Sequence, residues 1–110
     1  MAYDEDLADR IRELIDADGV TEKRMFGGLA FLIGGHMAVA ASGQGGILVR
    51  IDPDEGEKLL EKDHVEPFEM RGKAMKGWLR VDEEGVQTKR QLEPWVKRGV
   101  KFASALPPKG

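Results

Sequence analysis

The sequence RMFGGLAFLIGGHMAVA, residues 24–40, consists of apolar segments separated by two glycine pairs. Apolar runs of this length that are bounded by glycine are typical of β-strands. Gly34-Gly35 is predicted to form a two-residue hairpin turn, because such turns need a positive φ. Gly27-Gly28 is predicted to form a bulge within one strand over residues 24–33. Both pairs are therefore expected to shape a β-sheet.

Neither glycine pair fits a phosphate-binding loop. A P-loop requires GxxxxGK[ST], and a dinucleotide-binding fold requires GxGxxG between a strand and a helix. Here one pair lies within a predicted strand and the other between two predicted strands, where no helix N-terminus is available to an anion. No cofactor is expected.

Helix and strand patterns alternate along the rest of the chain. Asp4 is a predicted N-cap for a helix that ends near Gly19, and Asp52-Pro53 is a predicted start of a short second helix. The further predicted strands cover residues 36–42, 47–51 and 78–81, with extended chain over 66–70 and a loop over 71–77.

Two starts are open for the last helix. Thr88 followed by Gln91 suggests a cap, but Pro94 would then remove a hydrogen bond inside the helix. A start near Glu93 avoids that conflict and is the favoured prediction. Pro107-Pro108 ends the helix.

These elements predict one α+β domain over residues 1–110. The predicted order is α-β-β-β-α-β-β-α, with an antiparallel sheet and the helices packed on one face. The chain has 110 residues and no cysteine, so disulfides and thiolate sites are excluded. It shows neither a secretory signal nor an apolar run of membrane-spanning length. We expect a soluble, cytoplasmic protein.

The formal net charge of −3 disfavours a constitutive nucleic-acid binder, which depends on neutralising phosphates. The charge is unevenly distributed. Residues 1–70 carry 7 Lys/Arg against 16 Asp/Glu, whereas residues 71–110 carry 10 against 4. The favoured interpretation is that acidic and basic segments meet within the molecule. A basic surface near the C-terminus is the alternative.

No pattern identifies catalytic or metal-binding residues. His36 and His64 are the only imidazoles, and no HxH or HExxH spacing accompanies them. The serines and threonines have no recognisable partner that would make one a nucleophile. We therefore expect no catalytic residue and no metal site.

Strand alternation predicts a second sheet face that the helices do not cover. If Val39 and the odd-numbered residues 47–51 pack beneath the helices, the residues between them face the other way. Such a flat, sparsely charged face is typical of a docking surface or a homodimer contact. Trp78 is either a core anchor, the favoured reading, or part of this surface. The candidate interface residues are Ala38, Ala40, Leu48, Met75 and Trp78.

Four segments closely resemble the TfoX N-terminal domain family, also called TfoX/Sxy after regulators of bacterial natural competence. They are RMFGGLAFLIGGHMAVA, VRIDPDE, PFEMRGKAMKGWLRV and LEPWVKRGVKFASALPPK, and the resemblance as a whole runs from about Asp6 to Lys109. The resemblance implies an α+β domain with the same order of elements, in a stand-alone single-domain member. The family has no agreed catalytic residues.

The favoured function is a non-enzymatic protein-interaction or regulatory module. In a regulatory role it would assist a transcription factor and would not read bases itself; a homodimer is another form of the same contact. A small-molecule enzyme is the least favoured reading. The alternative is weak nucleic-acid binding through Arg71, Lys73, Lys76, Arg90, Lys97, Arg98 and Lys101.

Overall fold

The computed structural model describes residues 3–15, 19–25, 27–43, 45–70 and 72–107. Within these ranges the helices are α1 (Glu5–Leu14), α2 (Pro53–Leu59) and α3 (Lys89–Ala105), with a 3-10 turn, η1 (Glu83–Val86), before the last. The strands are β1 (Val20–Met25), β2 (Gly28–Ile33), β3 (His36–Ala41), β4 (Ile47–Arg50), β5 (Val65–Met70) and β6 (Lys73–Val81).

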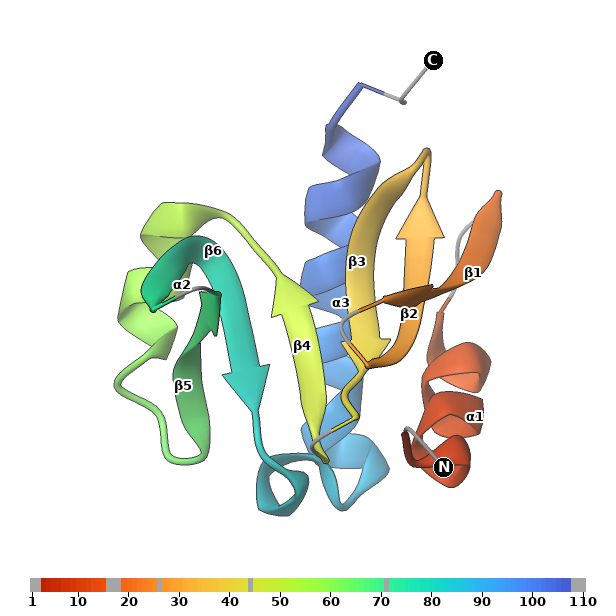
Figure 1. The fold of residues 1–110 in the computed structure, drawn as a ribbon, viewed down its shortest axis with the longest axis horizontal. Helices are drawn as coiled ribbons and strands as arrows, with labels where there is room; N and C mark the ends of the chain where they lie inside the picture. The colour runs from red at the N-terminus through yellow and green to blue at the C-terminus, as the bar shows by residue number, and fades with distance from the viewer. Residues whose placement is uncertain (1–2, 16–18, 26, 44, 71, 108–110) are drawn as a thin grey trace.

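The strands form one antiparallel sheet in the order β1-β2-β3-β4-β6-β5. Helix α3 runs along one side of this sheet, with α1 beside it near β1 and β2 (Figure 1). Buried side chains of α1, α2 and α3 all belong to one apolar cluster with the strand residues that face them. The predicted α+β class, the antiparallel sheet and the packing of helices on one face are confirmed.

The predicted turn at Gly34-Gly35 is confirmed. Ile33 pairs with His36 across the hairpin, and the two glycines adopt φ angles of 59° and 85°. Most residues with a Cβ are strained at such angles, so glycine is favoured here.

The predicted bulge at Gly27-Gly28 is wrong. Met25 pairs with Gly28, so the chain reverses between them and residues 24–33 belong to two strands, β1 and β2. Strand β1 lies at the sheet edge, and four of its residues, 21–24, are exposed and polar. An edge strand of this composition carries no apolar alternation, which is why a hydrophobic pattern does not reveal it.

Three further boundaries differ from the predictions. Helix α1 ends at Leu14 and not near Gly19, because its C-cap Ile15 already has an extended backbone. Helix α3 begins at Lys89, because Thr88 and Gln91 form a complete capping box in which each side chain accepts the backbone N–H of the other residue. Pro94 therefore lies inside the helix. Strand β6 begins at Lys73, which pairs with Met70 of β5, so residues 73–77 are strand and not loop.

Candidate functional site

The side of the sheet opposite the helices carries a second apolar cluster, hereafter the open-face cluster. All its members come from strands, and no helix in the described ranges contributes to it. A contiguous apolar patch on a sheet face that no second layer covers is typical of an interaction site. Ala30, Met37, Ala40 and Leu48 form its buried floor, and Leu32, Phe68 and Trp78 are half-buried around them.

Three predicted interface residues lie in the open-face cluster. Ala40 and Leu48 are floor residues with 1% and 2% exposure, so neighbouring side chains cover them. Trp78 lies at the half-buried margin. Met75 is exposed at 37%, and it does not belong to the cluster.

Ala38 was expected on this face, and that expectation is wrong. The register between β2 and β3 shifts after Phe31, which leaves Ala38 as an extra residue on β3. Ala38 and Val39 therefore both belong to the helix-side core, and Met37 takes the open face instead. A bulge breaks strict alternation because it inserts one residue that has no partner across the ladder.

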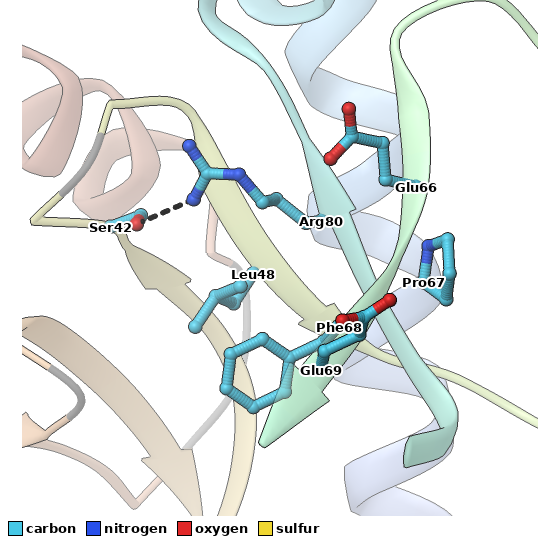
Figure 2. A pocket seen from close by; sticks show the side chains of 7 residues that line it. All are labelled: Ser42, Leu48, Glu66, Pro67, Phe68, Glu69 and Arg80. Atoms are coloured by element: carbon cyan, nitrogen blue, oxygen red, sulfur yellow. Dashed lines mark hydrogen bonds between the residues drawn. The ribbon is translucent and has the colours of Figure 1, made fainter. Parts of the chain in front are cut away.

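A hollow of about 430 Å³ opens beside the cluster, between β4, β5 and β6 (Figure 2). The Arg80 guanidinium reaches across it, and its Nη1 donates a hydrogen bond of 2.9 Å to the Ser42 hydroxyl. Ser42 is a buried polar side chain, with 5% exposure. The hollow combines an apolar floor, a guanidinium and two carboxylates. Its lining residues are Ser42, Leu48, Glu66, Pro67, Phe68, Glu69 and Arg80.

Aromatic rings and a second arginine continue this face toward the other end of β4. The Phe68 and Trp78 ring centroids are 6.2 Å apart. Arg50 pairs with Trp78 across β4 and β6, and its guanidinium carbon lies 5.2 Å from the Trp78 ring centroid. The same carbon lies 5.5 Å from the ring centroid of Phe102 on α3. Both distances are within cation–π range.

The fold agrees with the family that the sequence resembles. The family profile of the TfoX N-terminal domain matches residues 12–103. The chain belongs to the TfoX N-terminal domain family. No curated protein matches the sequence as a relative.

In this TfoX N-terminal domain, sequence reasoning missed Ser42, Arg80 and Arg50 as site residues. Ser42 and Arg80 are 38 positions apart, and they meet because β3, β4 and β6 are neighbours in the sheet. A lone serine and a lone arginine carry no motif that would have linked them. No sequence pattern pointed to Arg50, because its two aromatic neighbours come from distant segments.

Three basic residues of the alternative site lie beside carboxylates in this domain. Lys97, Arg98 and Lys101 line one hollow together with the carboxylates Asp52 and Glu55. Within the described ranges, Arg98 pairs with Glu55 at 3.3 Å and Lys97 lies 3.8 Å from Glu93. Lys73, Lys76 and Arg90 are exposed on β6 and α3, and Arg71 lies outside the described residues. The basic last helix is therefore interleaved with acidic groups, chiefly from α2.

The two histidines of the TfoX N-terminal domain make separate contacts. The His36 Nε2 donates to the Pro107 carbonyl oxygen at 2.6 Å, and His64 Nδ1 lies 3.1 Å from an Asp82 carboxylate oxygen. Among the residues that the structure places, no group of three His, Asp or Glu side chains could hold a metal ion. None of the helices within those ranges has the length and apolar character needed to cross a membrane.

Proposed function

We propose that this TfoX N-terminal domain is a non-enzymatic protein-interaction module that works through the open face of its sheet. The observation that supports the proposal is that the open-face cluster is built by strands alone, while every described helix packs on the other side. Half-buried Leu32, Phe68 and Trp78 present the large side chains of this face. Trp and Phe are enriched in protein interfaces, and the mixed hollow beside them gives polar groups for orientation.

We further propose a regulatory role, in which the domain contacts a transcription factor and does not read bases. The interleaving of acidic and basic groups on α3 supports this choice over direct nucleic-acid binding, since phosphate binding needs unopposed positive charge. The family takes its name from regulators of natural competence, which favours a regulatory partner. A homodimer through the same face is the second form of the contact.

Photo-crosslinking from two positions tests the proposal. Leu32 on the open face and Leu60 at the end of α2 are each replaced by a photo-crosslinking phenylalanine analogue in the native host. Leu60 is the matched control because it is also an apolar side chain at the surface, with 36% exposure, outside both apolar clusters. We expect a protein adduct of defined mass from position 32 and none from position 60.

The adduct mass separates the two forms of the contact. An adduct of twice the chain mass identifies a homodimer, and a heavier adduct that contains a transcription factor identifies a regulatory partner. Unchanged melting temperatures establish that both variants are folded. The absence of any adduct at position 32, or identical adducts at both positions, would contradict the proposal.

A further inference from the structure

Three arginines in the described ranges lie over aromatic rings, and two of them are also paired with a carboxylate. The guanidinium carbon of Arg12 is 5.8 Å from the Phe31 ring centroid, and its Nε and Nη2 donate to Glu22 at 2.7 and 2.8 Å. The guanidinium carbon of Arg98 is 4.9 Å from the Trp95 ring centroid, and its Nε lies 3.3 Å from Glu55. The ring holds the flat guanidinium face, and the carboxylate takes the N–H groups at its edge.

Arg50 also lies over aromatic rings, but no carboxylate of the described residues pairs with it. Its guanidinium lies over Trp78 and Phe102, and within the described residues no hydrogen bond or ion pair engages its N–H groups. Two carboxylates that line a hollow together with Phe102 already have partners. Asp52 accepts the Asp54 backbone N–H at 2.9 Å as the cap of α2, and Glu55 pairs with Arg98.

The sheet explains why Arg50 reaches both rings. Pairing between β3 and β4 ends at Val39 and Val49, immediately before Arg50. On its other side Arg50 stays paired with Trp78, and its guanidinium also lies within cation–π range of Phe102 on α3. Arg50 is half-buried, so part of its side chain remains accessible to solvent. Rings that restrict a guanidinium lower the ordering cost of binding a further group to it.

We infer that Arg50 is the anchor for an acidic side chain, Asp or Glu, of a protein partner. This inference rests on the proposed function and names the chemistry of the partner. Charge complementarity supports a carboxylate, because the guanidinium fork matches its two oxygens and the other two ring-stacked arginines use that group. The open-face cluster beside Trp78 favours apolar residues next to the acidic one. The partner segment is thus an Asp or Glu flanked by apolar side chains.

NMR of arginine side-chain Nε–H groups tests the inference on the full chain. The probes are the blocked tripeptide acetyl-Leu-Glu-Leu-amide, its Gln counterpart, and inorganic phosphate. We expect the Arg50 resonance to shift saturably with the Glu peptide, with roughly fivefold weaker binding of the Gln peptide. The Arg98 resonance is the internal control, because that arginine is ring-stacked but already paired with Glu55.

Arg50→Lys keeps the charge and removes the fork, so it should lose the preference for Glu over Gln. Equal shifts with both peptides, a larger shift with phosphate, or an Arg98 shift as large as that of Arg50 would overturn the inference. Should the variant fail to fold, the two peptides on the wild-type chain still decide. If position 32 gives a crosslinked adduct but the Arg50 resonance does not shift, only this inference is contradicted. If the Arg50 resonance shifts but position 32 gives no adduct, the proposed function is contradicted.

Discussion

Gly99 of α3 lies directly against the backbone of Ala38: a Cβ built at residue 99 would be 2.3 Å from the Ala38 carbonyl oxygen. The bulge in β3 brings this carbonyl beneath the helix, and only a residue without a side chain allows α3 to approach so closely. The same bulge turns Ala38 toward the helices and Met37 toward the open face. One contact therefore couples helix packing to the composition of the proposed docking surface.

Gly99→Ala should destabilise the domain, although Gly→Ala inside a helix usually stabilises it. Helix propensity favours Ala by about 1 kcal/mol. The clash with a backbone carbonyl forces α3 away from the sheet and should cost about 1–3 kcal/mol more than that gain. Urea unfolding measures the difference. Ser104→Ala, at an exposed position of the same helix, is the control and should be neutral or slightly stabilising; a stabilised Gly99→Ala variant would refute the close contact.

The turn at Gly34-Gly35 should distinguish between side chains at its first position. Gly34 has a φ of 59°, which Asn adopts readily and a β-branched residue does not. Gly34→Asn should leave the stability nearly unchanged, whereas Gly34→Val should cost about 1–2 kcal/mol. Thermal unfolding of the two variants checks this. Equal melting temperatures would show that the hairpin does not require a left-handed residue.

Glu22 should stabilise the fold at neutral pH and lose that effect in acid. The hydrogen bond from Arg12 holds the pKa of Glu22 below its usual value of 4.5. A pKa lowered by folding means that the stabilisation is present above 4.5 and is lost as the pH falls through the folded-state pKa. Because the pair is exposed, the effect should be modest.

Melting temperatures of wild type and Glu22→Gln between pH 7 and pH 3 measure this effect. The wild type should melt higher at pH 7, and the gap should close as the pH falls. Glu13→Gln on α1 is the control, since no ion pair involves Glu13 within the described ranges. A gap that stays constant with pH would mean that the charge of Glu22 contributes nothing.

The Ser42 hydroxyl should stabilise the Arg80 side chain across the hollow. Ser42→Ala removes the acceptor of the 2.9 Å hydrogen bond and should cost about 1 kcal/mol of unfolding free energy. Urea unfolding measures the cost, again against Ser104→Ala. A more sensitive readout is the Arg80 Nε–H resonance, which should broaden in the variant. An unchanged resonance would show that other contacts hold Arg80 in place.

The starts of the first two helices and the tight turn could be predicted because each depends on residues a few positions apart. The Asp4 and Asp52 side chains accept backbone N–H groups in the first turn of the helix that follows each of them. Gly34-Gly35 reverses the chain between the paired residues Ile33 and His36. The fold class followed, since short connections between strands imply an antiparallel sheet. Family membership could be predicted as well, because the four sequence segments that resemble the family can be recognised without knowledge of tertiary contacts.

Only the tertiary structure decided which side chains share a face. A one-residue bulge reverses every side chain that follows it, and the register that creates it depends on the neighbouring strand and on the helix above. Arg50 meets Trp78 and Phe102, and Ser42 meets Arg80, through segments far apart in the chain. No local pattern specifies such meetings, because they arise from strand order and from where pairing ends.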